Sequence, residues 1–360
     1  MRNFWEKLES PILALAPMAG VTDKAFRQIC KEQGADVIYT EFASVDALIH
    51  GNQRTRDMIS FTNEERPVVV QIFGNDPEKI GAACRIVEEL GFDGVDINFG
   101  CPAYKVVKNG GGVACMRDLD LLHDIVQAAC ESVAIPVSIK IRASIKKKAS
   151  DLEKKSDRSF EYNSPLIAEE GVGGGGRDGT LPQSPPSQRE EVVITAVDLM
   201  EAVKELPVAA VMIHARSYEK PFDGKADDEI IKAIRPLVKG KLIANGGVHT
   251  PEDAENIMKG TGADGVGLAR GVWGSPWLFK MTKDYLTNGS YKEPAWADKI
   301  KIILRHAELA LEAKGEYGII EMRKHFSHYI RGFPGASAVR QKLVRVSALK
   351  DIKSILDSSF

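Results

Sequence analysis

The sequence predicts an α/β protein, a TIM (β/α)₈ barrel followed by a smaller C-terminal α-helical domain. Eight short runs rich in Val and Ile are nearly continuous in hydrophobicity, which is typical of parallel strands buried on both faces. Helical patterns separate most of these runs, and right-handed strand–helix–strand units of this kind close into a barrel. After about residue 293 the alternation ends, and helical periodicity continues to Asp357. A doubly wound open sheet is the alternative architecture.

The expected strands are short apolar runs. In order, the strands are Ile12–Ala16, Asp36–Thr40, Pro67–Phe73, Gly94–Asn98, Val137–Arg142, Ala209–His214, Lys241–Asn245 and Gly265–Leu268. The barrel is expected to cover 1–292 and the helical domain 293–360.

The expected helices have local start and stop signals. Asp76–Leu90 has Pro77 in its first turn and ends before Gly91, and Thr22 is a candidate N-cap for Thr22–Glu32. The other expected barrel helices are Leu119–Ser132, Ile194–Leu206, Asp227–Val238, Pro251–Lys259 and Pro276–Leu286. The second crossover, Phe42–Asn63, has the least regular pattern, and we expect it to be mostly loop.

One segment, at about 146–191, does not fit the alternation. It begins with three lysines and contains a glycine-rich and a proline-rich stretch. This composition buries too little apolar surface to offset its ordering entropy, so we expect a disordered insertion in a βα loop. Such loops lie on the catalytic face of a barrel, so substrate contact and a tolerated surface insertion are both open.

Composition excludes several classes of protein. The five cysteines are an odd number, widely spaced and without a CxxC pair, which argues against a disulfide framework or a zinc site and fits a reducing cytosol. No run approaches about 18 uninterrupted apolar residues, and the first residues lack an apolar signal segment. We therefore expect a cytoplasmic protein, with no membrane partner and no metal.

Charge is distributed unevenly, although the formal net charge is only −2. Residues 323–353 hold eight Lys or Arg, beginning with Arg323 and Lys324, and one acid, Asp351, with His, Phe and Tyr residues interleaved. A compact basic region with aromatic residues is typical of a polyanion-binding surface. A solvated helical face over core aromatic residues is the alternative.

The stretch Asn98-Phe99-Gly100-Cys101-Pro102 follows an expected strand, and Gly110-Gly111-Gly112 comes shortly after it. A thiol at the C-terminal end of a barrel strand occupies a catalytic position. Free cysteine also packs readily in cores, so the motif alone leaves Cys101 open between these two roles.

Six polar residues lie toward the C-terminal ends of five expected strands: Gln71, Asn98, Lys140, Arg142, His214 and Asn245. Asn245-Gly246-Gly247 and Ala269-Arg270-Gly271 follow strands seven and eight, where barrels bind phosphate on backbone N–H groups. A phosphate-bearing cofactor beside Lys140 and Gln71 fits FMN, whose anionic form a fixed Lys would stabilise. No GxGxxG segment follows a strand and opens a helix, so NAD(P)H is expected to dock only transiently.

Together these motifs resemble the tRNA-dihydrouridine synthase family. In order, they are Ala16-Pro17-Met18-Ala19-Gly20-Val21-Thr22-Asp23, Val70-Gln71-Ile72-Phe73-Gly74, the Cys101 stretch, Ile139-Lys140-Ile141-Arg142, Ile213-His214-Ala215-Arg216, Asn245-Gly246-Gly247, Ala269-Arg270-Gly271 and Met322-Arg323-Lys324-His325. The similarity covers everything except about 146–191.

The resemblance implies an FMN-bound TIM barrel with a helical tRNA-binding domain. It assigns flavin contacts to Pro17, Met18, Ala19, Gln71, Lys140, His214, Asn245, Gly246, Gly247, Ala269 and Arg270, catalysis to Cys101, and substrate or tRNA contacts to Asn98, Arg142, Arg216, Arg323 and Lys324.

The implied reaction reduces the C5=C6 bond of a uridine that has flipped out of the tRNA. Hydride passes from flavin N5 to C6, Cys101 protonates C5, and NADPH or NADH is the reductant of an enzyme expected to be monomeric. Two alternatives are an FMN-dependent barrel oxidoreductase acting on a small molecule and an RNA-binding protein without catalysis. The basic C-terminal region argues against the first, and the intact Cys101, Lys140, Gln71 and Arg270 argue against the second.

Overall fold

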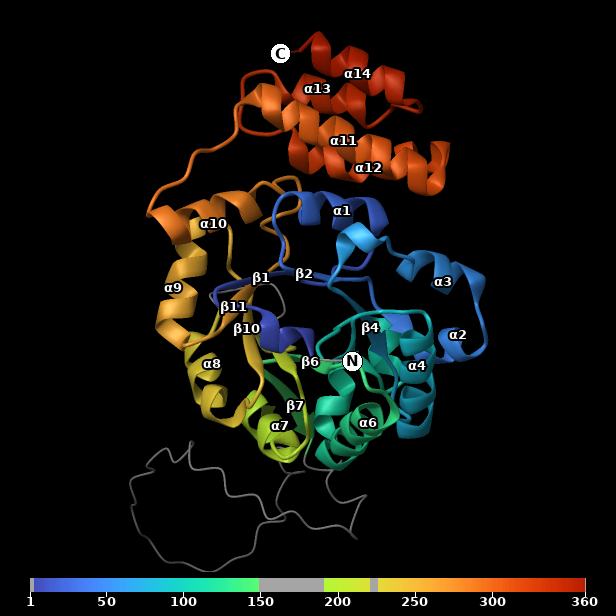
Figure 1. Cartoon of the computed structure of the whole chain (residues 1–360), viewed down its shortest axis with the longest axis vertical. Coiled ribbons are helices and arrows are strands. Elements are labelled where there is room, and N and C mark those ends of the chain that lie inside the picture. Colours follow the sequence, from blue (N-terminus) through green and yellow to red (C-terminus); the bar gives the residue numbers. More distant parts are fainter. Residues whose placement is uncertain (1–2, 149–190, 221–225, 360) are drawn as a thin grey trace, which may run out of the picture.

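The eight predicted strands are confirmed in a computed structural model that describes residues 3–148, 191–220 and 226–359 (Figure 1). Their bounds are β1 (Ile12–Leu15), β2 (Val37–Tyr39), β4 (Val68–Phe73), β5 (Gly94–Asn98), β6 (Val137–Arg142), β9 (Ala210–His214), β10 (Lys241–Asn245) and β11 (Gly265–Leu268). A short strand β3 (Ala43–Ser44) continues alongside β4.

The sheet closes on itself. Every neighbouring pair is parallel, β1 pairs with β11 (Ile12 opposite Gly265), and β2 pairs with β4 to complete the ring. The fold is therefore a TIM barrel, and the open-sheet alternative is wrong. A cluster containing Ile12, Tyr39 and Met212 packs separately from the larger core that includes the surrounding helices.

Helices of the barrel lie outside the ring of strands (Figure 1). Their bounds are α1 (Lys24–Glu32), α2 (Val45–Ile49), α3 (Gln53–Ile59), α4 (Pro77–Glu89), α5 (Tyr104–Lys108), α6 (Leu119–Ser132), α7 (Ala196–Val203), α8 (Asp228–Ile234), α9 (Pro251–Thr261) and α10 (Leu278–Asn288), with 3₁₀ turns at Phe4–Lys7, Asn63–Glu65, Gly112–Arg117 and Arg235–Leu237.

The N-cap of α1 is Asp23, so the assignment of Thr22 to that position is wrong. The Asp23 carboxylate accepts the Phe26 N–H at 3.0 Å. The Thr22 hydroxyl instead bonds the backbone of Met18, one turn earlier, and that turn leaves Asp23 with the extended conformation of a cap.

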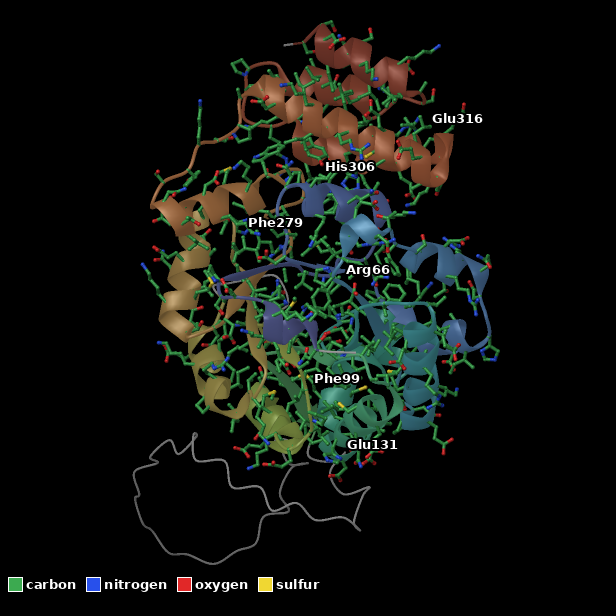
Figure 2. The ribbon with its side chains drawn as sticks, in the orientation of Figure 1. Arg66, Phe99, Glu131, Phe279, His306 and Glu316 are labelled. Atoms are coloured by element: carbon green, nitrogen blue, oxygen red, sulfur yellow. The ribbon has the colours of Figure 1, made fainter. Side chains whose placement is uncertain are left out.

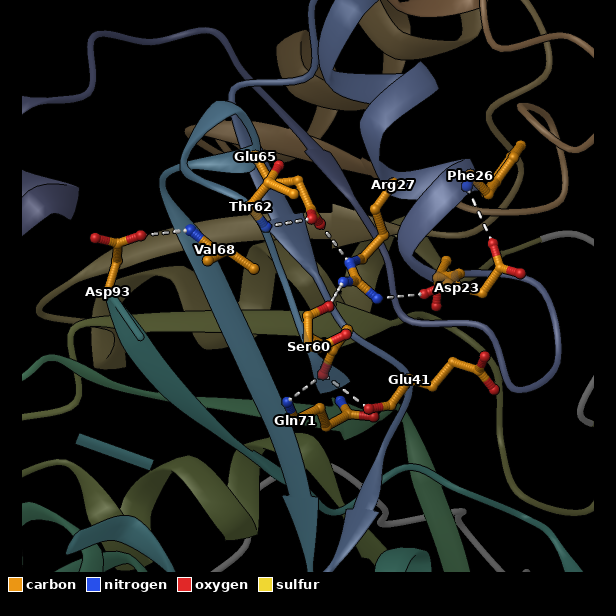
Figure 3. A network of polar contacts seen from close by, with 12 residues as sticks. Asp23, Phe26, Arg27, Glu41, Ser60, Thr62, Glu65, Val68, Gln71 and Asp93 are labelled. Atoms are coloured by element: carbon orange, nitrogen blue, oxygen red, sulfur yellow. Dashed lines mark hydrogen bonds and ion pairs between the residues drawn. The ribbon is translucent and has the colours of Figure 1, made fainter. Parts of the chain in front are cut away.

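The second crossover is not mostly loop, as the sequence had suggested, because it contains α2 and α3. Asn52 caps α3 by accepting the Thr55 N–H. The following turn is anchored by a tertiary contact: Glu65 accepts from Arg27 of α1 at 2.7 Å, and both side chains are completely buried (Figure 3). A local sequence pattern cannot predict that these two residues, which are far apart in the chain, are buried together.

The predicted insertion at about 146–191 has structured ends. Residues of β7 (Ser144–Lys148) pair antiparallel with β8 (Glu191–Thr195), with Ile145 opposite Ile194 and both buried. Lys146 and Lys147 are therefore in a strand, and Ile194 belongs to β8 rather than to the helix that follows. Residues 149–190 lie outside the described part of the chain.

Four helices follow the barrel: α11 (Trp296–Lys314), α12 (Glu316–Tyr329), α13 (Ala336–Leu343) and α14 (Leu349–Asp357). They form a layer beyond α1 and α10 (Figure 1). Their apolar faces share a core that includes Ile303, Phe326 and Leu343, and Ala25 and Ile29 of α1 join it. The helical periodicity predicted from the sequence is thus confirmed, and it buries this second core.

Candidate active site

The barrel opens into a cavity of about 710 Å³ at the C-terminal ends of its strands. Its lining brings together every predicted site residue of the barrel: Pro17, Met18, Ala19, Gln71, Asn98, Cys101, Lys140, Arg142, His214, Arg216, Asn245, Gly246, Gly247, Ala269 and Arg270. They come from opposite sides of the ring, which is why a closed barrel is needed to assemble them.

Cys101 lies at the end of β5 with only 9% of its surface exposed. The Asn98 side-chain oxygen accepts the N–H groups of Gly100 (3.0 Å) and Cys101 (2.8 Å), which fixes the turn that carries the thiol. Burial raises the pKa of Cys101, although Arg142 and Lys140 act in the opposite direction. The thiol therefore keeps its proton at neutral pH and is suited to donate it.

Cationic and neutral side chains surround this thiol. Burial lowers the pKa of Lys140 to about 8, and burial together with nearby cations lowers that of His214 to about 2, so His214 is neutral at physiological pH. The Arg142 Nε donates to the Gly100 carbonyl at 2.7 Å. The described lining contains no carboxylate, so the cavity is suited to an anionic ligand.

Glycines after β10 and β11 leave room beside these cations. Gly246 has a φ of +111°, and a Cβ there would lie 2.9 Å from His214 Cδ2. Asn245 donates to the Gly267 carbonyl at 2.6 Å, which ties the ends of the two strands together. Gly246, Gly247 and Arg270 line this part of the cavity, and glycine loops beside an arginine at these positions of a barrel fit a phosphorylated cofactor.

Comparisons with known proteins agree with this geometry. The sequence model of the family described as Dihydrouridine synthase (Dus) matches residues 14–158 and 189–360. The chain belongs to the dihydrouridine synthase family. It is therefore an oxidoreductase.

Relatives in this family are similar over nearly the whole chain. The tRNA-dihydrouridine synthase B of Pseudomonas aeruginosa is 31% identical, and the match covers 93% of this chain and 88% of that protein. A probable tRNA-dihydrouridine synthase of Mycobacterium tuberculosis is also 31% identical, with 98% and 82% covered. Among solved structures, a histamine dehydrogenase from Rhizobium sp. 4-9 matches with a TM-score of 0.49 and 12% identity, covering 96% of this chain and 61% of that one.

The two predicted tRNA contacts that lie in the helical region, Arg323 and Lys324, are not in the cavity lining. Both are on α12, and the Arg323 guanidinium donates to the carbonyls of Val346 (2.9 Å) and Arg345 (3.4 Å). Arg323 therefore holds the turn before α14. Lys324 is half-buried and lies near enough to Glu41 of the barrel to influence its pKa.

Several residues of the site were not predicted from the sequence. Phe42, His249 and Trp273 also line the cavity, and each follows a strand, so their positions after strand ends were the available signal. Asp96 lies beneath the cavity and contacts Gln71. The sequence signal for Asp96 was an acidic residue between two apolar residues in the expected strand Gly94–Asn98.

The helices offer no evidence of membrane insertion: among the described residues, none is both long enough and apolar enough to span a bilayer.

Proposed function

We propose that this protein is an FMN-dependent tRNA-dihydrouridine synthase that reduces the C5=C6 bond of specific uridines, with NAD(P)H as reductant. The observation that carries the proposal is a buried thiol at the rim of a cavity whose described lining contains Lys140, Arg142 and glycine loops but no carboxylate. The family membership and the names of its relatives support the choice of substrate.

The cavity offers separate groups for each part of FMN. Arg270 and the backbone of Asn245, Gly246, Gly247 and Ala269 would hold the phosphate, and Pro17, Met18, Ala19, Gln71, Lys140 and His214 would contact the ring system and its chain. When bound, FMN supplies the hydride that adds to C6 of the uracil. NAD(P)H would dock transiently over the same opening.

The chain's own residues would handle the uracil and the proton. Asn98 and Arg142 would orient the base by hydrogen bonds, since both reach the lining beside Cys101. Negative charge develops at C5 and O4 during the addition, and Lys140 and Arg142 would stabilise it. The Cys101 Sγ would then transfer its proton to C5.

The tRNA itself would contact the helical domain, for which we propose the boundary at residue 293. Five basic side chains of the region are exposed while its apolar residues pack inward: Arg331, Lys342, Arg345, Lys350 and Lys353. Arg216 and Lys324 would extend this surface toward the cavity. We propose that one chain suffices, acting in the cytoplasm, because its residues supply the complete lining.

The decisive experiment replaces the thiol. In Cys101→Ala, we expect bound flavin and NADPH oxidation to be retained and dihydrouridine formation to fall at least about 100-fold, because the proton donor is missing. Nucleoside mass spectrometry of unmodified tRNA after incubation measures the product. Cys130→Ala, a half-buried cysteine on α6, is the control and should match the parent. Loss of bound flavin in Cys101→Ala would contradict the assignment.

A further inference from the structure

Asp96 is a buried acid that the reaction described above does not use. It is fully buried on β5, in register with Gln71 of β4 on one side and Ser138 of β6 on the other. Its carboxylate accepts the Gln71 Nε2 at 2.8 Å and the Ser138 hydroxyl at 2.7 Å. The three side chains thus form one polar layer across three adjacent strands, directly below the cavity.

A directional chain of hydrogen bonds leads from this layer to the thiol. The Gln71 NH₂ group donates to Asp96, so the Gln71 Oε1 faces Asn98 and accepts a hydrogen bond from Asn98 Nδ2 at 2.7 Å. Asn98 then has its own oxygen available for the N–H groups of Gly100 and Cys101. Asp96, Gln71 and Asn98 are at most 5% exposed, so a lost partner leaves a largely buried polar group unsatisfied.

The carboxylate decides the direction of the chain. An ionised carboxylate only accepts hydrogen bonds, whereas an amide side chain can bond in either of two flipped orientations. If Gln71 flipped, its oxygen would face the carboxylate and its NH₂ group would face the NH₂ group of Asn98. Both contacts would be lost in a buried site, so Asp96 selects one orientation for both amides.

Asp96 also supplies negative charge close to a cavity whose described lining has none. Its charge opposes the effect of burial on Lys140, which lies in register with Asn98 on β6. The acid therefore serves the rim in two ways, by orienting amides and by stabilising the charged lysine.

We propose that Asp96 is a positioning residue that fixes Gln71 and Asn98 and thereby places the Cys101 turn for proton transfer. The inference rests on the proposed function only where it calls Cys101 the proton donor. The placement itself can be tested without tRNA.

The test compares the alkylation of single cysteines. Iodoacetamide is added to the flavin-loaded protein, and mass spectrometry follows the peptides containing Cys101 and Cys130 separately. The variants are Asp96→Ala, Asp96→Asn and Ser138→Ala. Asp96→Asn can keep an oxygen toward Gln71, and Ser138 bonds the same carboxylate but lies outside the path to the thiol.

We expect Asp96→Ala to raise the alkylation rate of Cys101 at least about threefold, because the turn is no longer held, and to leave Cys130 unchanged. In the same variant, kcat for dihydrouridine should fall about tenfold with little change in KM for tRNA. Asp96→Asn should leave both values between those of the parent and of Asp96→Ala, because an amide accepts from Gln71 in only one of its two flipped orientations. Ser138→Ala should match the parent at pH 8, where Asp96 stays ionised although burial raises its pKa to about 6. If Asp96→Ala does not fold, Asp96→Ser takes its place, since it leaves a polar group in the layer.

Equal changes at Cys101 and Cys130 would show general loosening and overturn the proposal, as would unchanged Cys101 alkylation and kcat. Parent-like values of both in Asp96→Asn would overturn the role of the acceptor-only carboxylate in amide orientation. If the parent protein makes no dihydrouridine, the proposed function fails, while a change specific to Cys101 would still establish the positioning role.

Discussion

At the scale of single residues, the part of the cavity lining that the structure describes contains lysine and arginine side chains and no carboxylate. His214 stays neutral because burial and Lys140, Arg142, Arg216 and Arg270 all oppose its protonation. The positive charge is therefore carried by lysine and arginine, whose charge an anionic ligand would compensate. The glycine loops beside them determine how closely such a ligand approaches.

Substituting one of these glycines tests the cradle. Gly246→Ala combines a positive φ with a Cβ 2.9 Å from His214 Cδ2, so we expect FMN affinity to fall at least about tenfold, roughly 1.4 kcal/mol. Quenching of FMN fluorescence on titration measures it. The matched control is Gly260→Ala on α9, where nothing lies within 4 Å and binding should be that of the parent. Equal affinity of both variants would rule out a cradle at this loop.

At the scale of elements, α1 contacts both the second crossover and the C-terminal helices. On one side Arg27 pairs with Glu65 and also donates to the carbonyls of Thr22 and Ser60 (Figure 3). On the other side α1 packs against α11 and contributes to the core of the C-terminal helices. A single short helix thus couples the second crossover to the helical layer.

Breaking the buried pair should cost far more than breaking an exposed one. We expect Glu65→Ala to lower the free energy of unfolding by about 3–5 kcal/mol, because it leaves the Arg27 charge buried without its partner. The exposed pair of Lys79 and Asp46 is the control, and Lys79→Ala should cost much less because solvent screens an exposed ion pair. Urea unfolding measures both variants. Similar losses in the two would show that the Arg27 carbonyl contacts alone hold the crossover.

Acid should weaken the joint between α1 and the C-terminal helices. His306 of α11, labelled in Figure 2, is buried and bonds the Tyr329 hydroxyl at 3.0 Å. Burial lowers its pKa to about 4; Asp23 opposes that effect, and Lys324 and Lys314 add to it. The pKa of the neighbouring His325 is lowered too, by burial first.

As the pH falls, His306 is protonated at a higher pH in the unfolded chain than in the folded protein. The stability that neutral His306 contributes is therefore fully present above pH 6.5 and is lost as the pH falls toward 4. The loss from His306 is on the order of 3 kcal/mol. Protonation of Asp23, whose pKa is also lowered, would add a further loss only at more acidic pH. The midpoint of thermal unfolding between pH 4.5 and 7 should depend less on pH in His306→Gln than in the parent. His50→Gln, an exposed histidine after α2, should keep the parent profile; identical slopes in all three proteins would refute the assignment.

At the scale of the whole molecule, the loop after β11 links the cavity to the C-terminal helices. Trp273 lines the cavity and stacks on His328 of α12, with ring centroids 3.8 Å apart and planes at 17°. The next residue, Gly274, has a φ of +84°, and a Cβ there would lie 2.3 Å from the His328 carbonyl carbon. The loop that carries Arg270 therefore touches α12 directly.

Adding a side chain at Gly274 should affect the proposed tRNA binding but not the proposed flavin binding. We expect Gly274→Ala to displace α12 and weaken tRNA binding about tenfold, while the protein keeps its flavin. Gly289→Ala is a close control, because Gly289 also has a positive φ but no atom within 4 Å of a Cβ. Filter binding with unmodified tRNA and flavin absorbance measure the two properties. Equal tRNA affinity in both variants would argue against this coupling.

The local pattern of the sequence was sufficient for the strands and for most helices. Runs such as Ile12–Leu15 and Gly265–Leu268 are apolar along their length because both faces are buried, and strands are observed there. Parallel strands separated by helices place all their C-terminal ends on one rim, so residues as distant as Gln71 and Arg270 could be assigned to one cavity from the chain order alone.

Tertiary structure alone decided the rest. The helices of the second crossover are anchored through Arg27 and Glu65, which are 38 residues apart, and the ends of the predicted insertion are ordered by pairing of Ile145 with Ile194. The direction of the Asp96, Gln71 and Asn98 chain likewise depends on register between strands. Period and composition report which residues are buried, whereas the partner that satisfies a buried polar group is chosen only when distant segments meet.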